Sequence, residues 1–274
     1  MQYASTFDVL AQRFTFAFLS VLFYNHLTKA EIRFSKQDLL RLLPLGLLYP
    51  LLFFILQIFG LQYASAMQTG LLTSVAPVIT LFFAHFLIHE PIVLKQVLGV
   101  LVAVLGVILL QWMNLRQSET GEFIGFILVF SSVFVMSLNI VLTRSYTKSY
   151  SWQKITTFIL ALSFLVFNGI ALTQHMIDGE WLSFFRPLTN LNYLFVLSFL
   201  GILSSFGTAL ISAYALSRMA SVPVAVFSSF SPLVTIISSV MILGESFYWY
   251  HFLGAVLITS GALITNLSKK SPNK

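Results

Sequence analysis

The chain has 274 residues, of which 58% are hydrophobic and only 9% are charged. A soluble domain carries charge on roughly 25% of its residues, so this sequence lacks the charges that a water-exposed surface needs. It contains no cysteine, which excludes a disulfide-rich scaffold, thiol catalysis and cysteine-ligated metal sites. The composition predicts an all-α polytopic membrane protein, embedded in a lipid bilayer.

The formal net charge is +6, but no dense cluster of Lys and Arg with interleaved aromatic residues is present. In a membrane protein, an excess of basic residues is typical of cytoplasmic loops. We therefore expect no nucleic-acid partner. Nothing in the sequence indicates a cofactor.

Apolar stretches of about 20 residues, the length of a membrane-crossing helix, recur along the chain with short polar breaks. The pattern predicts nine spans. In chain order they are 9–27, 42–61, 66–89, 94–115, 123–146, 155–175, 193–216, 221–243 and 248–267.

The charges in the loops predict how the spans are oriented. Alternate loops, beginning with the one after the first span, together with the basic tail 269–274 carry 12 of the 15 Lys and Arg residues. Most acidic residues, Asp8 among them, fall on the opposite side. Because cytoplasmic loops are enriched in basic residues, we expect the C-terminus in the cytoplasm and the N-terminus outside a plasma or inner membrane.

Identical residues recur at an offset of 155 positions, which indicates an internal repeat; we call this spacing the repeat offset. It relates Pro77 to Pro232, Glu90 to Glu245, Gly99 to Gly254 and Gly106 to Gly261. It contains five spans, an odd number, so the second copy is inverted relative to the first, as in many secondary transporters. We expect a first repeat at 1–115 with four spans and a second at 121–268 with five.

The two copies of Pro-x12-Glu-x8-Gly-x6-Gly resemble the EamA-like branch of the drug/metabolite transporter superfamily. The step Gln12-Arg13 resembles the arginine that opens the family's second helix. The resemblance implies ten helices with both ends cytoplasmic, and export or import of small metabolites, amino acids or drugs. The family's first helix has no counterpart here, so a truncated start or a non-transporting remnant is an alternative.

Polar residues at helical spacing mark one face of the spans at 42–61, 66–89, 123–146, 193–216 and 221–243. The resemblance implies a central cavity lined by the same helices. We therefore predict a substrate cavity, with hydroxyls that only pack between helices as the alternative. Its residues are Tyr49, Gln57, Thr73, Pro77, Asn139, Ser205, Thr208, Ser228, Ser231 and Pro232.

Pro77 and Pro232 lie at the midpoints of their spans, where proline removes a backbone donor and kinks a helix. Paired interruptions in two halves point to a transporter binding site. Glu90 and Glu245 lie at span ends, so we expect them to cap or pack helices. His85 and His89 have metal-ligand spacing beside Glu90, but they lack a third ligand, and we predict no metal site.

Gly99 and Gly106, and likewise Gly254 and Gly261, fall two turns apart on one helix face. Small residues at this spacing let helices approach closely. We expect an internal packing contact, with the seam of a homodimer as the alternative.

The predicted spans carry no acidic or basic residue at the midplane. We expect Arg13 to extend toward the outer interface, with contact to a substrate carboxylate as the alternative. A neutral, zwitterionic or amphipathic small molecule is therefore the expected substrate. The sequence favours a metabolite transporter that works by alternating access. An intramembrane acyl or lipid transferase is the alternative, although no histidine lies at the midplane among the polar stripes.

Overall fold

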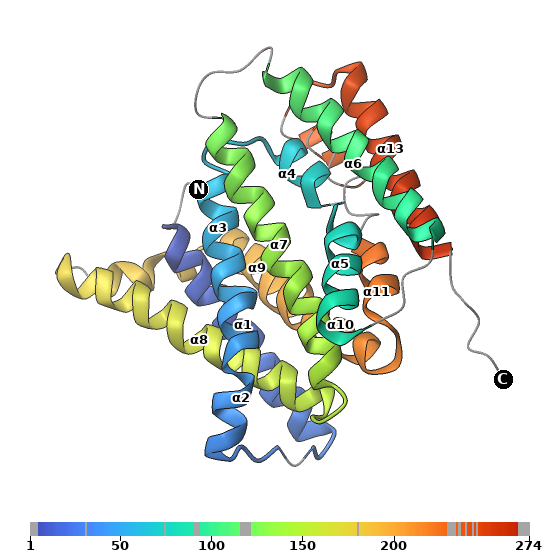
Figure 1. The fold of residues 1–274 in the computed structure, drawn as a ribbon. Coiled ribbons are helices and arrows are strands. Elements are labelled where there is room, and N and C mark those ends of the chain that lie inside the picture. Colours follow the sequence, from blue (N-terminus) through green and yellow to red (C-terminus); the bar gives the residue numbers. More distant parts are fainter. Residues whose placement is uncertain are drawn as a thin grey trace. The chain divides into compact units, whose positions relative to one another are not determined.

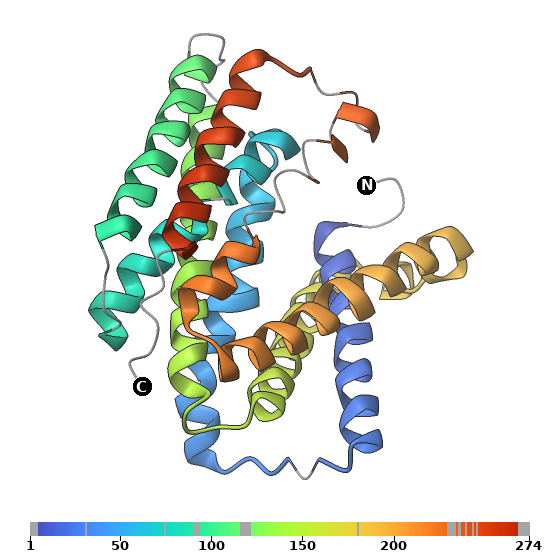
Figure 2. The same cartoon turned by 90° about the vertical axis from the view of Figure 1, so that its right-hand side faces the viewer.

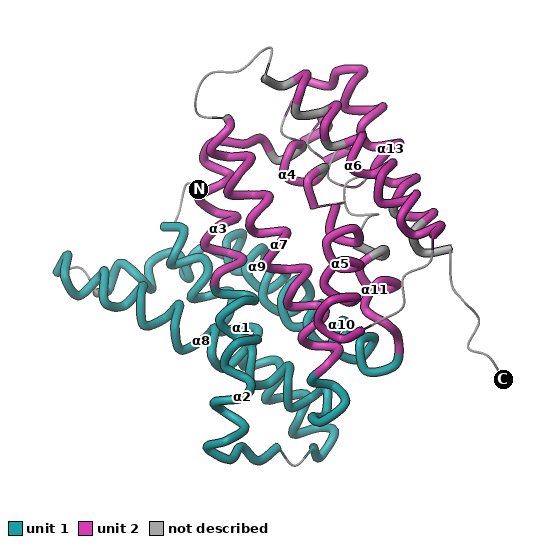
Figure 3. The backbone as a smooth tube through the Cα atoms, in the orientation of Figure 1, with its two compact units in different colours: residues 1–51, 146–218 teal, residues 52–145, 219–274 magenta. Residues whose placement is uncertain are grey.

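The computed structural model describes residues 5–30, 32–73, 75–89, 94–115, 122–179, 181–228, 234, 237–238, 240–242, 244 and 246–267. Within these residues every regular element is a helix (Figure 1). The chain forms two compact units (Figure 3), which are described separately. Unit 1 comprises residues 1–51 and 146–218, and unit 2 comprises residues 52–145 and 219–274.

The helices of the two units have the following bounds. Unit 1 contains α1 (Thr6–Leu27), α2 (Lys36–Gly46), the π-helical η1 (Leu47–Leu52), α8 (Trp152–Ile177), the 3-10 segments η2 (Trp181–Phe184) and η3 (Arg186–Thr189), α9 (Leu191–Ser198), the π-helical η4 (Phe199–Gly207) and α10 (Thr208–Arg218). Unit 2 contains α3 (Phe53–Gly60), α4 (Ala66–Thr73), α5 (Ala76–Ile88), α6 (Leu94–Leu115), α7 (Glu122–Tyr146), α11 (Ser221–Ser228) and α13 (Trp249–Leu267).

Five helical stretches in the described part of the chain are long and apolar enough to cross a membrane. They are Thr6–Leu27, Lys36–Gly60, Phe123–Tyr146, Trp152–Ile177 and Leu191–Arg218. Two shorter apolar helices, Ala76–Ile88 and Leu94–Gly106, accompany them. The all-helical class expected from composition is confirmed, whereas the number of nine spans stays a prediction.

Local side chains define where several helices of unit 1 begin. Ser35 caps α2: its hydroxyl accepts the backbone N–H of Asp38 at 3.1 Å, and the Asp38 carboxylate accepts the N–H of Ser35 at 2.9 Å. This reciprocal capping box satisfies two donors that a helix start otherwise leaves without partners. Asn190 caps α9 in a related way, because its Oδ1 accepts the N–H of Tyr193.

The repeat offset seen in the sequence also relates elements of the structure. It connects the first residues of α2 and α9, of α3 and α10, of α4 and α11, and of α6 and α13. The same offset connects the last residues of the π-helical segments η1 and η4, Leu52 and Gly207. Matching starts and matching interruptions are what two copies of one structural unit produce.

Each compact unit takes helices from both halves of the sequence. In unit 1, α1 packs along α8 and η4, and α2 packs on α8. In unit 2, α6 packs along α13, and α5 packs on α11. The boundaries at 1–115 and 121–268 therefore describe repeats along the sequence, whereas each compact unit combines helices from both repeats.

Helices α6 and α13 lie side by side in both views (Figures 1 and 2) and meet at glycines. A Cβ atom placed on Gly106 would lie 2.8 Å from Ile258 Cγ1 and 3.1 Å from the carbonyl oxygen of Gly254. At the other end of the contact, a Cβ on Gly261 would meet the carbonyl oxygen of Gly99. Two helices can approach this closely only where side chains are missing.

The pairing of these glycines shows the direction of the two helices. Gly99 faces Gly261 and Gly106 faces Gly254, so α6 and α13 run antiparallel. The repeat offset exchanges the two contacts, as an approximate two-fold axis through the helix pair would. All four glycines are buried in this internal contact, so they do not provide the seam of a homodimer.

Within the described residues, three of the predicted spans are interrupted. The stretch 66–89 forms α4 and α5, with Pro77 in the first turn of α5, where the missing N–H of proline has no helical partner to lose. Segments η1 and η4 interrupt 42–61 and 193–216, and Tyr49 of η1 has an extended backbone (φ −134°, ψ 127°). Pro232 lies outside the described residues.

Candidate functional site

Helix α1 carries polar side chains that are buried. Asp8 is 4% exposed and Gln12 is 3% exposed. Polar groups at membrane depth need partners within the protein, because hydrocarbon offers none. Asp8, which the loop charges predicted on the outer side, lies in the first turn of α1.

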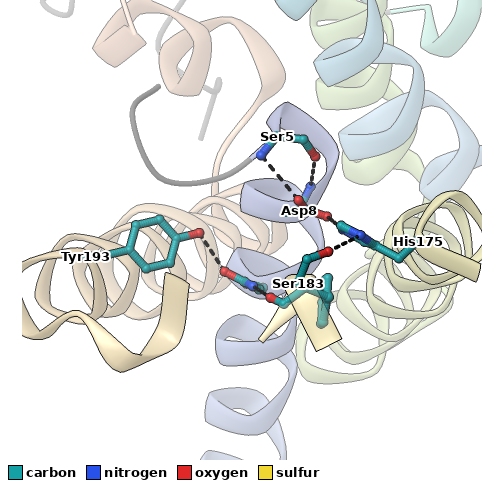
Figure 4. Close-up of polar contacts among 7 residues, drawn as sticks. Ser5, Asp8, His175, Ser183 and Tyr193 are labelled. Carbon is teal, nitrogen blue, oxygen red and sulfur yellow. Dashed lines mark hydrogen bonds and ion pairs between the residues drawn. The ribbon is translucent and has the colours of Figure 1, made fainter. Parts of the chain in front are cut away.

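At the start of α1, a chain of hydrogen bonds joins three elements of unit 1 (Figure 4). His175 Nε2, near the end of α8, lies 2.8 Å from Asp8 Oδ1, and Ser183 Oγ of η2 lies 2.8 Å from His175 Nδ1. The Asp8 carboxylate also accepts the backbone N–H of Ser5 in a capping box. We call Asp8, His175 and Ser183 the Asp8 network. It holds the connection after α8 against α1.

Gln12 extends these contacts by one helical turn along α1. Its Nε2 donates to the carbonyl oxygen of Phe184 at 2.6 Å, and its Oε1 accepts the hydroxyl of Tyr193 from α9 (Figure 4). Both amide atoms of this buried side chain are therefore satisfied. The first two turns of α1 consequently hold both η2 and the start of α9.

Arg13 directs its guanidinium toward η4. Nε donates to Ser205 Oγ at 2.6 Å, and one Nη donates to Ser204 Oγ at 3.1 Å. Tyr49 of η1 interacts electrostatically with the same guanidinium. The expectation that Arg13 extends toward the outer interface is wrong, because serine hydroxyls of η4 hold it inside unit 1. We call Arg13, Tyr49, Ser204 and Ser205 the Arg13 cluster.

The Arg13 cluster combines equivalent positions of the two halves. The repeat offset relates Tyr49 to Ser204, and these residues lie in the interrupted segments η1 and η4. Breaks of this kind in membrane helices are tolerated where the backbone lines a cavity or is buried in protein, and π-helical turns are frequent at functional sites. A Cβ on Gly201 would lie 2.8 Å from the carbonyl oxygen of Arg13, so α1 and η4 come together one turn before Ser205.

The predicted cavity residues of unit 1 divide into two groups. Tyr49 and Ser205 belong to the Arg13 cluster, and Ser205 is 8% exposed. Thr208 is exposed, and its hydroxyl donates to the carbonyl oxygen of Ser204 within its own helical stretch at 2.7 Å. Thr208 therefore does not join the cluster.

The predicted cavity residues of unit 2 lie on α3, α4, α5, α7 and α11. Gln57 and Thr73 are partly buried, whereas Pro77 and Asn139 are buried. The stripe that contains Thr73 also has two buried hydroxyls, those of Thr69 and Thr80, without a hydrogen-bond partner among the described residues. Ser228 ends α11, and its side chain is not described. Outside the described residues lie Ser231, Pro232, Glu90 and Glu245.

Several polar residues of this site were not predicted from the sequence. Asp8 and Gln12 are one turn apart on a mostly apolar stretch, which is a usable signal of a polar helix face. Their partners His175 and Tyr193 are 167 and 181 residues away, so no local pattern predicts them. Among the described residues, no group of three His, Cys, Asp or Glu side chains is placed to hold a metal ion.

The model of the EamA-like transporter family matches this chain over residues 1–112 and 123–267. The chain belongs to the EamA-like transporter family. The two matched segments fall on either side of the loop between the predicted repeats. Membership in this family places the chain among multi-pass membrane transporters.

Two curated relatives resemble this EamA-like chain along most of its length. The uncharacterized transporter YcxC of Bacillus subtilis (strain 168) is 32% identical over 274 residues, which cover 100% of this chain and 88% of YcxC. The uncharacterized transporter YetK of the same organism is 29% identical over 245 residues, which cover 87% of this chain and 71% of YetK. A solved crystal structure has a TM-score of 0.70 at 16% identity and covers 97% of this chain and 90% of its own, which shows a shared fold.

Proposed function

We propose that this EamA-like protein moves small metabolites across the cell membrane by alternating access, with amino acids and other neutral, zwitterionic or amphipathic solutes as substrates. The Arg13 cluster carries the proposal: two interrupted helical segments at equivalent positions, η1 and η4, present polar side chains to one partly buried guanidinium. Interrupted helices in corresponding positions of two repeats are the strongest structural pointer to a transporter substrate site.

The inverted repeat supports the alternating motion. The antiparallel contact of α6 with α13 through exchanged glycine pairs is what two copies of opposite membrane orientation require. When the two copies adopt different conformations, the site opens to one side, and exchange of those conformations opens it to the other. In this proposal the C-terminus is cytoplasmic and the N-terminus is outside, as the loop charges favour.

Two contacts in unit 1 are suited to act as gates. Asp38, at the start of α2, pairs with Lys154 of α8 at 2.7 Å between Oδ2 and Nζ. Tyr193 is the equivalent of Asp38 by the repeat offset, lies at the start of α9, and bonds to Gln12 of α1. The loop charges favour opposite membrane faces for these equivalent positions, so one contact opens as the site faces the cytoplasm and the other as it faces outward.

Transport by the purified protein tests this function. We expect the full-length chain, reconstituted in liposomes, to accumulate at least one labelled solute from a panel of amino acids, aliphatic and aromatic acids, and their amides. Protein-free liposomes provide the baseline. If the protein adds nothing to the flux of any member of the panel in either direction, the proposed function is wrong.

The Asp8 network contains a serine, a histidine and an aspartate in hydrogen-bonded order, the pattern of an activated nucleophile. The Asp8 network is therefore the one observation that favours an intramembrane acyl transferase, and it has to be tested. We expect Ser183 to remain unlabelled by a fluorophosphonate probe, because its hydroxyl bonds within the connection that His175 holds in place. Mass spectrometry of the probe-treated protein measures this, with Ser183→Ala as the control. A covalent adduct on Ser183 would support the enzyme instead.

A further inference from the structure

We infer that the Arg13 cluster binds an anion and that the transported substrate carries a carboxylate. The inference rests on the proposed transport function and names the class of its substrate. It follows from the depth of Arg13, from the hydrogen-bonding character of its neighbours and from the charge at the equivalent position of the second repeat.

Arg13 lies far inside a membrane-crossing helix. It is the eighth residue of the 22-residue α1, so its Cα is about 5 Å along the helix axis from the midpoint at a rise of 1.5 Å per residue. Basic side chains at such depth are costly, face the protein interior and mark substrate or ion paths. Helix packing alone needs no permanent cation here, because neutral side chains also bond helices together.

The neighbours of Arg13 suit a ligand that only accepts hydrogen bonds. A guanidinium presents N–H donors in a planar fork that matches a carboxylate. Ser204 and Ser205 accept from Arg13, and each retains its own hydroxyl proton to donate. Because an ionised carboxylate is an acceptor only, it complements this combination better than an amide or an ammonium group does.

The second repeat favours a singly charged ligand. The repeat offset relates Arg13 to Asn168, a neutral amide that donates to the carbonyl oxygen of Ala11 and to the hydroxyl of Thr15. The equivalent position therefore contributes no second cation. Since a buried excess of charge is penalised at low dielectric, one guanidinium matches a carboxylate more closely than a doubly charged phosphate monoester.

The cluster is not fully buried within unit 1. Arg13 and Ser204 are partly buried, so both residues retain some exposed surface. A ligand carboxylate is then able to approach the fork while the serine hydroxyls turn their protons toward it.

A matched set of small acids and amides tests the inference on the full-length protein in detergent. The probes are phenylalanine with phenylalaninamide, leucine with leucinamide, and phenylpropionate with phenylpropionamide, together with phenyl phosphate. We expect at least one carboxylate to raise the melting temperature and its amide partner to have little effect. Arg13→Gln should raise the ligand concentration that gives half of the maximal stabilisation roughly ten- to a hundredfold, the range for a lost charge-assisted hydrogen bond. Arg13→Lys should retain part of the stabilisation.

Arg186→Gln is the matched control, because it removes an exposed basic residue of unit 1 and should leave the response unchanged. Ser204→Ala should weaken the response less than Arg13→Gln does, and it keeps the test decisive if Arg13→Gln does not fold. Three results with the wild-type protein overturn the inference: no carboxylate stabilises it, amides stabilise it equally, or phenyl phosphate acts in place of the carboxylates. A response of Arg13→Gln equal to that of the wild type would also overturn it.

Flux through liposomes separates this inference from the transport function. Movement of amides but not of carboxylates would support the transport function and contradict the inference that the substrate carries a carboxylate. Binding of carboxylates without any movement would retain the site and overturn transport.

Discussion

We expect Asp8→Ala to lower the free energy of unfolding by about 2–4 kcal/mol, because one carboxylate has two structural roles at the start of α1. Loss of its part in the helix cap costs about 1 kcal/mol. Loss of the acceptor for His175 leaves a polar group without its partner, which costs roughly 1–3 kcal/mol. Thermal unfolding of the detergent-solubilised protein, followed by intrinsic tryptophan fluorescence, measures the change.

Asp38→Ala is the matched control, because Asp38 has the same position in the capping box of α2. Its carboxylate pairs with Lys154 in a more exposed setting, where the side chains are 18% and 19% exposed, compared with 5% for the Asp8 side chain. Because solvent screens such a pair, we expect a smaller loss than for Asp8. Equal losses from both substitutions would show that the Asp8 network adds nothing beyond the helix cap.

A second large effect is expected at the contact of α6 with α13. A Cβ atom on Gly261 would lie 2.8 Å from Ala103 Cβ and would also meet the backbone of Gly99. Backbone atoms cannot rotate away as a side chain does, so Gly261→Ala forces the helices apart. We expect a loss of about 1–3 kcal/mol, the range for overpacking a tight contact, measured by the same unfolding assay.

Gly169→Ala is the control for this substitution. Gly169 lies within α8, and a Cβ there meets nothing within 4 Å. Alanine should therefore raise stability by roughly 0.5–1 kcal/mol, because it is the better helix former. If Gly261→Ala behaved like Gly169→Ala, the close packing of α6 against α13 would be refuted.

Features that depend on neighbouring residues were predictable from the sequence. The apolar composition indicated the helical membrane class, and the repeat offset anticipated matching helix starts, such as those that follow Ser35 and Asn190. Pro77 marked a break that the structure places between α4 and α5. Helix periodicity, caps and proline breaks all arise within about one turn of the chain, so a linear pattern contains them.

The residues that meet at the site were predictable only in part. Tyr49 and Ser205 were predicted as cavity residues because they lie on polar faces of their helices. Those patterns did not show that Arg13 interacts with them. Helix α1 begins at Thr6 rather than near residue 9, which puts Arg13 deeper than the hydropathy pattern suggested. The hydropathy pattern likewise placed Asp8 just before the first span, whereas the Ser5 cap includes it in the first turn of α1.

The sequence alone determined the membrane class, the internal repeat and the family resemblance, because each depends on composition or on spacing along one chain. Only the tertiary structure decided that Arg13 faces Ser204 and Ser205, 191 and 192 residues away. That partnership depends on how closely α1 packs against η4 at Gly201. Packing of this kind arises from the shapes of both surfaces together, and a single helix pattern contains only one of them.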